Sequence, residues 1–242
     1  IVPEPDYQHL LSLLPRECFE IGEVDKQNAS LFVINNVAVF PQNIKTIRDF
    51  AFAAKPFVEQ DFLFYVCGFG VETVKNSGFL AQRRLRRAVF PELKTIEDEA
   101  FHDNYMLSSF SAKNCKIIGE IAFGVCPNLK NVDFDPTKVG KHAFMHSGVE
   151  EVSFPNLTEL EDFCFNNSAL RLLKIEKCSK ISELAFGSPI VPVEIQCPIE
   201  QESLPINCTK VLSVELSSRK RGQLERIAKF STRAKEYKQK LI

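Results

Sequence analysis

The stretch EIAF, from Glu120 to Phe123, decides the fold because close variants of it return at a fixed interval. KHAF (141–144), DFCF (162–165) and ELAF (183–186) follow, each 21 residues after the one before. Toward the N-terminus the same register continues at intervals of 22, 22 and 27 residues, and its members are Phe52, Phe79, Phe101, Phe123, Phe144, Phe165 and Phe186. The residue before each of them is small: Ala51, Gly78, Ala100, Ala122, Ala143, Cys164 and Ala185. Such an interval indicates stacked structural repeats.

A second register runs in phase with the first. It comprises Phe90, Phe110, Phe134, Phe154, Ile175, Ile195 and Leu216, at intervals of 20 to 24 residues. Apolar and polar residues alternate around each position, which predicts a short strand. We therefore expect each repeat to contain a strand, a bend and a tight helical turn that carries Ala-Phe. Stacked strands lie ~4.8 Å apart, so the small residue makes room for the next coil and the phenylalanines form an internal ladder.

The pattern of LKNVDF (129–134) followed by VGKHAF (139–144) resembles the BspA-like, or Treponema-type, leucine-rich repeat family. The resemblance covers roughly residues 31–216. It implies an α/β repeat solenoid, a leucine-rich-repeat superhelix with a parallel sheet on the concave face and short helical turns on the convex side. It also implies a role in recognition, often adhesion.

The two ends differ from the repeats. Residues 1–30 are expected to form an N-terminal cap, with Asp6 as the N-cap of a helix. From Ser217 to Ile242 there are nine Lys or Arg and two Glu, a local charge of +7, which leaves −8 for residues 1–216 of the formal total of −1. We interpret residues 217–242 as a basic capping helix. A dimerising helix, or one that seeks an acidic or membrane surface, remains open.

Residues with chemical potential form no catalytic or ligand-binding pattern. His142 and His146 lie four apart but lack the HExxH arrangement, so we expect solvated histidines rather than a metal site. QRRLRR (82–87) is interpreted as a solvated turn, not a nucleic-acid signal, because no aromatic residues are interleaved with it. We expect no enzyme activity, no cofactor and no nucleic-acid partner. No run of 18 apolar residues occurs, so no membrane insertion is expected.

The eight cysteines bear on the compartment. Cys18 and Cys164 precede phenylalanines, in the small-residue position, and Cys115 and Cys178 share another position of the repeat three coils apart. Three coils span ~14 Å by strand spacing, too far for a disulfide. We expect mostly free thiols and hence an intracellular, cytoplasmic location. The alternative is a cell-surface or secreted protein whose signal was removed, and four N-x-S/T sequons, at Asn28, Asn156, Asn166 and Asn207, suit that alternative.

The function predicted from these patterns is a non-enzymatic protein–protein interaction module. The outward strand positions form a polar, mildly acidic row on the concave face, which suits a basic partner. The residues expected to bind the partner are Asn131, Asp133, Glu151, Ser153, Lys174, Glu194 and Glu215. The alternatives are a cell-surface adhesin or antigen, and a structural scaffold. In the scaffold, the basic C-terminal helix docks on the acidic body of another copy and gives a homo-oligomer.

Overall fold

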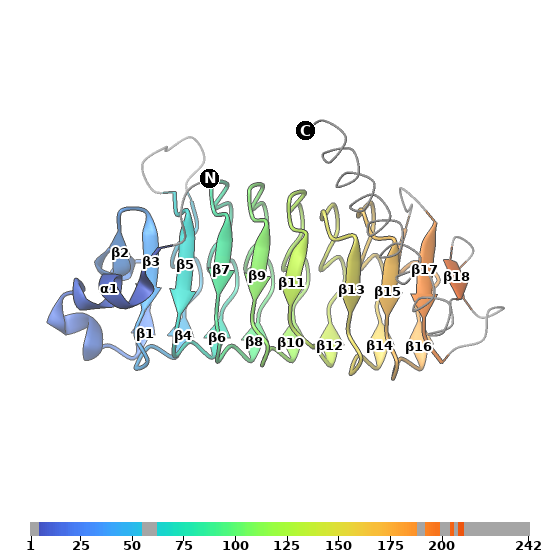
Figure 1. Cartoon of the computed structure of the whole chain (residues 1–242), viewed down its shortest axis with the longest axis horizontal. Coiled ribbons are helices and arrows are strands. Elements are labelled where there is room, and N and C mark those ends of the chain that lie inside the picture. Colours follow the sequence, from blue (N-terminus) through green and yellow to red (C-terminus); the bar gives the residue numbers. More distant parts are fainter. Residues whose placement is uncertain (1–4, 55–61, 188–191, 199–203, 206–207, 211–242) are drawn as a thin grey trace, which may run out of the picture.

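Each coil from β3 to β16 carries one longer strand and one two-residue strand, on separate sides (Figure 1). The computed structural model describes residues 5–54, 62–187, 192–198, 204–205 and 208–210. The longer strands are β3 (Val37–Phe40), β5 (Tyr65–Gly68), β7 (Arg87–Val89), β9 (Ser109–Ser111), β11 (Asn131–Asp133), β13 (Glu151–Ser153), β15 (Leu172–Lys174), β17 (Val193–Gln196) and β18 (Cys208–Lys210). The two-residue strands are β1 (Glu23–Val24), β4 (Thr46–Ile47), β6 (Thr73–Val74), β8 (Thr95–Ile96), β10 (Ile117–Ile118), β12 (Lys138–Val139), β14 (Glu159–Leu160) and β16 (Lys180–Ile181).

Both series form parallel ladders, and both ladders are interrupted at the same coil. The longer strands pair in the order β11-β9-β7-β5-β3-β2 and, separately, β13-β15-β17-β18. The short strands pair in the order β1-β4-β6-β8-β10-β12 and, separately, β14-β16. β2 (Val33–Ile34) is antiparallel to β3. Within the described residues the solenoid is therefore divided between β11 and β13 on one side and between β12 and β14 on the other.

The prediction of helical turns around the Ala-Phe pairs is wrong. In the part of the chain that the structure describes, the only α-helix is α1 (Tyr7–Ser12), with two short 3₁₀ helices at Arg16–Phe19 and Ala29–Phe32. Alternate turn amides bond to the next coil instead of to their own: Phe101 N donates to Ala122 O at 2.9 Å, and Phe123 N donates to Ala143 O at 2.8 Å, whereas Gly124 N donates within its own turn to Ile121 O at 2.8 Å. Because these donors are used between coils, they cannot close helical turns. The fold is a parallel β-solenoid rather than an α/β solenoid.

Residues with a left-handed backbone make these hydrogen bonds between the turns of successive coils possible. Residues two before and two after a ladder phenylalanine have positive φ in most coils, including Ile121 (φ 55°) and Val125 (φ 54°) on either side of Phe123. Their amides donate to Lys141 O at 3.0 Å and to Met145 O at 2.8 Å. This conformation is a genuine outlier for β-branched residues and costs ~1–2 kcal/mol per residue. The inter-coil hydrogen bonds hold it in place.

The phenylalanine ladder is confirmed. The rings of Phe101, Phe123, Phe144 and Phe165 stack successively with centroids 5.6, 5.5 and 5.3 Å apart, and Phe186 follows at 6.2 Å. Interplanar angles along this series stay at or below 15°. Among the strand-register rings, Phe110 meets Phe123 edge-on at 4.9 Å, whereas Phe134 lies closer to parallel with Phe123, at 5.8 Å and 23°. The small residues beside the ladder, such as Ala122 and Cys164, are fully buried.

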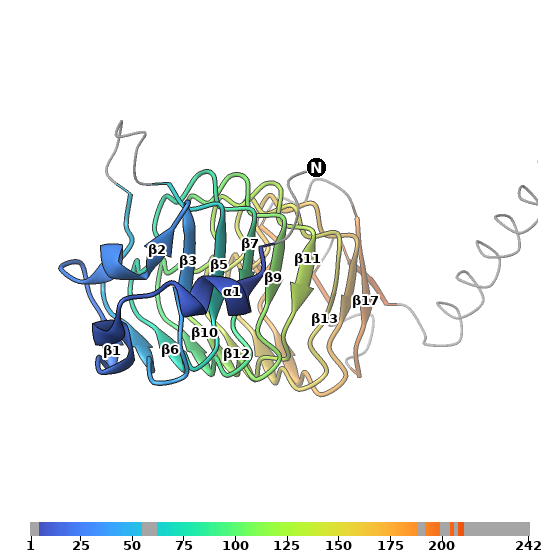
Figure 2. The same cartoon turned by 60° about the vertical axis from the view of Figure 1, so that its left-hand side comes forward.

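The N-terminal segment closes one end of the solenoid. Asp6 caps α1 by accepting hydrogen bonds from Gln8 N and His9 N, as predicted, and α1 contacts β3 (Figure 2). Phe19 does not belong to the ladder, because its side chain is 48% exposed, so the repeat position assigned to Cys18 is wrong. Residues 217–242, expected to be a capping helix, lie outside the described residues. None of the described helices has the length and apolar character needed to cross a membrane.

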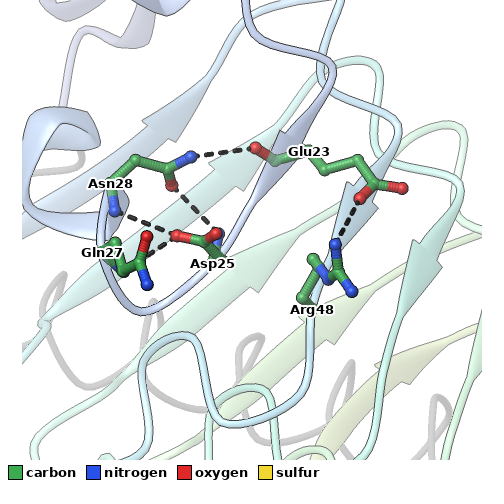
Figure 3. A network of polar contacts seen from close by, with 5 residues as sticks. All are labelled: Glu23, Asp25, Gln27, Asn28 and Arg48. Atoms are coloured by element: carbon green, nitrogen blue, oxygen red, sulfur yellow. Dashed lines mark hydrogen bonds and ion pairs between the residues drawn. The ribbon is translucent and has the colours of Figure 1, made fainter.

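A polar turn after β1 ties the first coil to the second (Figure 3). The Asp25 carboxylate accepts from Gln27 N and Asn28 N, and the Asn28 side chain closes the turn by accepting from Asp25 N and donating to Glu23 O at 3.2 Å. Arg48 of the next coil pairs with Glu23 at 3.2 Å. Asn28 is one of the sequon asparagines, and its amide thus serves the turn.

Replacing Phe144 by Ala tests the ladder. Removing a fully buried ring that stacks on both neighbours should lower the free energy of unfolding by ~3–5 kcal/mol. Phe50→Ala is the control, because that side chain is 52% exposed, and it should cost less than ~1 kcal/mol. Denaturant melts measure both. A loss below ~1 kcal/mol for Phe144→Ala would contradict the ladder.

Replacing Val125 by Asn tests the strained turn. Asn tolerates the left-handed region, and Asn167 holds it at the same repeat position with φ 50°. The variant should raise the free energy of unfolding by ~0.5–1 kcal/mol. Val125→Ala, which lacks that preference, should be less stable than Val125→Asn in the same melt. The opposite order would show that the turn is not strained.

Candidate interaction surface

The side chains of the longer strands that point away from the phenylalanine core form a surface that we call the strand face. The ladder column Ala38, Val66, Ala88, Phe110 points inward, because Phe110 packs on the core rings. The residues on either side of that column point outward, since strand side chains alternate. On β9 and β11 these are Ser109 and Ser111, and Asn131 and Asp133.

The strand face changes character along the solenoid. On β3 and β5 the outward side chains are apolar or aromatic and buried: Val37, Val39, Tyr65 and Cys67. On β9 the two serines are half-buried, whereas on β11 and β13 all four outward residues, Asn131, Asp133, Glu151 and Ser153, are exposed. The first coils therefore cannot offer a polar site here, and the exposed polar part begins at β11.

The structure brings the predicted residues together only in part. Asn131 and Asp133 lie on β11, Glu151 and Ser153 lie on β13, and these two strands flank the interruption of the sheet. Lys130 and Glu150, which precede the two strands, form an ion pair of 3.4 Å across that boundary. The four residues thus share a face but not one hydrogen-bonded ladder.

Lys174 and Glu194 do not stand in one row, contrary to the prediction. Lys174 lies opposite Ser153 and Gln196, whereas Glu194 lies opposite Leu172, which in turn faces Glu151. Ile195 aligns with Leu173 rather than with Ile175. A shift of two residues keeps the inward and outward faces unchanged, so the alternation in the sequence cannot reveal it.

Glu215 and the strand expected around it lie outside the described residues. The strand that follows β17 is β18, and Thr209 is the residue opposite Glu194. That step spans 15 residues, shorter than the 21 to 28 residues between paired positions of the other parallel long strands. The described sheet therefore contains a strand, β18, that the repeat interval did not predict.

The charges of the strand face are only loosely paired. Asp133 accepts a hydrogen bond from the Ser111 hydroxyl at 3.3 Å and lies 3.8 Å from Lys113 Nζ, with both charged side chains more than half exposed. Exposed pairs of this kind contribute little to stability. The carboxylate is therefore available to an incoming cation at small cost.

The histidines and thiols show no catalytic arrangement. The His142 ring stacks on Phe163 at 5.1 Å, and no group of three potential metal ligands occurs among the described residues. None of the eight cysteines is in a disulfide; seven are buried, and Cys197 is partly exposed. Cys115 and Cys178 occupy the shared repeat position that was expected, because each thiol contacts the carbonyl two residues ahead, of Ile117 and Lys180.

Aromatic neighbours of the QRRLRR segment were missed in the sequence. Gln82 and Leu85 are buried, and the arginines between and after them contact Phe62, Phe64 and Tyr105 of adjacent coils. Each aromatic residue lies 22 residues from its arginine. The repeat interval, rather than the local sequence, was the signal that could have found them.

The repeats match a known family model. The model of the BspA type leucine rich repeat region matches in six copies, over residues 31–136 and 72–190. No curated protein matches the sequence.

Several solved structures are similar at low identity. The leucine-rich repeat protein of Treponema pallidum is 17% identical, with 76% of this chain and 82% of that chain covered and a TM-score of 0.46. A leucine-rich repeat protein of Eubacterium ventriosum is 17% identical, with 69% and 40% covered and a TM-score of 0.41. The pneumococcal vaccine antigen PcpA is 15% identical, with 71% and 67% covered and a TM-score of 0.40.

Thiol titration tests the cysteine environments. Burial raises the pKa of Cys115, Cys126 and Cys208 to about 12, so these thiols stay protonated at pH 8 and the reactive thiolate is scarce. With a disulfide reagent at pH 8, Cys197 should react first in the native protein. All eight should react after unfolding without reduction. A never-reduced sample without titratable thiols would reveal disulfides and place the protein in an oxidising compartment.

Proposed function

Because this chain belongs to the BspA-type leucine-rich repeat family, we propose that it is a non-enzymatic module that binds a protein partner through the exposed end of the strand face. The leucine-rich repeat is a general protein-interaction fold. The observation that carries the proposal is the exposure of Asn131, Asp133, Glu151 and Ser153, next to strands whose outward residues are buried or half-buried.

These four side chains do not pack in the core, so core packing does not explain why polar and acidic residues occupy these positions. The core of the solenoid is made by the inward residues and the phenylalanine ladder, so the outward positions of β11 and β13 can vary without loss of the fold. They nevertheless present two carboxylates and two small polar groups side by side. Such a surface selects its partner by hydrogen bonding and charge rather than by apolar burial.

The partner that fits this surface is basic. Asp133 and Glu151 are exposed, and Glu194, on the same row as Glu151, adds a third carboxylate. Residues 1–216 carry a net charge of −8, which attracts a cationic partner before contact. Association should therefore be fast at low salt and slower as salt increases.

Two alternatives use the same surface differently. In an assembly scaffold, the +7 segment 217–242 of one copy is the basic ligand of the next. An adhesin or antigen at the cell surface differs from the first proposal in compartment, which the thiol titration addresses.

Charge reversal tests the strand face. Asp133→Lys combined with Glu151→Lys should leave the melting curve nearly unchanged, because both side chains are exposed. Partners captured by the unaltered protein are identified by mass spectrometry and purified. Their association rate with the variant, measured by surface plasmon resonance at low salt, should fall by about tenfold or more.

The matched control reverses two carboxylates on the turn side, Glu120→Lys with Glu183→Lys, which are also exposed. This control should bind as the unaltered protein does. Equal loss in both variants would mean that only overall charge matters. Binding that survives the strand-face reversal but disappears on deletion of residues 217–242 would make the basic segment the binding element, and light scattering at two salt concentrations would then report assembly.

A further inference from the structure

Three arginine–aromatic pairs gather where the chain enters β5, β7 and β9, along the upper edge of the solenoid in Figure 1. The guanidinium carbon of Arg84 lies 5.5 Å from the centre of the Phe62 ring, and that of Arg86 lies 5.6 Å from the centre of the Phe64 ring. In these two pairs the aromatic residue belongs to the preceding coil. In the third pair it belongs to the following coil: the guanidinium carbon of Arg83 lies 5.4 Å from the centre of the Tyr105 ring. All three distances are within the range of an attractive cation–π contact.

The backbone fixes these pairs in register. Arg86 N donates to Phe64 O at 2.9 Å, and Ser108 N of the following coil donates to Arg86 O at 2.9 Å. Leu85, between the two arginines, is fully buried, which anchors the segment and leaves Arg84 exposed and Arg86 half-exposed. Arg84 lies in a turn, in which Leu85 N donates to Gln82 O at 2.9 Å, and Arg86 lies where the chain enters β7, so the two arginines flank the buried Leu85.

Two of the three guanidinium groups have no ion pair with any carboxylate that the structure describes. Arg83 forms an ion pair with Asp103 at 3.1 Å, whereas neither Arg84 nor Arg86 has a carboxylate within ion-pair distance in the described part of the chain. A guanidinium stacked on a ring is held by its face, so its N–H edge remains free for a bidentate contact with an oxyanion. The geometry therefore presents two guanidinium edges to which none of the described carboxylates is bonded.

We propose that Arg84 and Arg86, with Tyr105 and Met106 beside them, bind an extended acidic segment of a protein partner. Carboxylates at alternate positions of an extended peptide are ~6.6 Å apart on one side of the chain, so such a peptide can present one carboxylate to each of two arginines that flank a single buried residue. Tyr105 and Met106 are 38% and 46% exposed and offer apolar contact to a neighbouring side chain of that peptide. This surface is separate from the strand face and prefers the opposite charge.

A peptide fits better than a nucleic acid. The rings of Phe62 and Phe64 each have a guanidinium group over one face, which competes with a base for that face. A polyanion would also meet the −8 charge of residues 1–216. A short segment with a few carboxylates avoids most of that repulsion.

The test uses a fluorescein-labelled octapeptide of alternating glutamate and valine, with fluorescence anisotropy as readout at low salt. The full chain should bind it, and the peptide with glutamine for glutamate should bind at least tenfold more weakly. Arg84→Met with Arg86→Met keeps the aliphatic cover over the two rings but removes the charges, and affinity should fall at least tenfold. Arg84→Lys with Arg86→Lys should lose several-fold, because lysine cannot make the bidentate contact.

Arg171→Ala is the matched control, since Arg171 is exposed on the same molecule but belongs to none of the three arginine–aromatic pairs, and it should leave binding unchanged. Circular dichroism melts establish that each variant is folded. Equal affinity for the glutamate and glutamine peptides, or binding unaffected by the Met variant, would overturn the proposal. So would tighter, Arg84- and Arg86-dependent binding of a labelled 16-nucleotide oligothymidylate, which would assign the surface to a polyanion.

Discussion

The stacking of one coil on the next at the spacing of a parallel sheet is the constraint on which the rest of this structure depends. Successive phenylalanine rings lie 5.0 to 6.2 Å apart with small interplanar angles, close to the strand spacing of ~4.8 Å. A flat ring without a polar group suits this spacing better than a branched aliphatic side chain does. The same constraint limits the residue beside each ring to alanine, glycine or cysteine.

The stacking also decides the backbone of the turns. Each turn must satisfy its amides, and the next coil offers carbonyl groups at the required distance, as Phe144 N and Cys164 O show at 2.8 Å. The chain accepts left-handed residues such as Ile121 and Val125 to aim these amides along the axis. Inter-coil bonding thus outweighs local conformational preference, in the turns as in the strands.

The period could be predicted from the sequence, whereas the register within a period could not. The positions of Phe123 and Phe144, the small-residue positions and the N-cap at Asp6 follow from periodicity and side-chain chemistry alone. The Ala-Phe turns look helical in sequence because their inter-coil hydrogen bonds involve partners about 20 residues away. Glu194 was placed beside Lys174 because alternation tells inside from outside but not one outward position from the next.

The two candidate surfaces could be predicted from the sequence to different degrees, because periodicity reveals which side of a strand a residue occupies but not how neighbouring coils pack. Exposure of Asp133 and Glu151 follows from their outward position, but the interruption between β11 and β13 depends on how two whole coils pack. The arginine surface was missed because Arg84 and Phe62 are neighbours only across coils. Comparing positions one repeat period apart reveals that pair, whereas comparing residues that are adjacent in the sequence does not.

The interruption of both sheets has a mechanical consequence. At that boundary the rings still stack, as Phe144 does on Phe165 at 5.3 Å, and the turn amides still bond, but neither strand ladder continues. In a linear array each interface contributes its own coupling to the stability of its neighbours. A tensile load along the axis would concentrate at this boundary, where one backbone ladder instead of three resists separation, and would part the molecule there into two blocks before either block unravels.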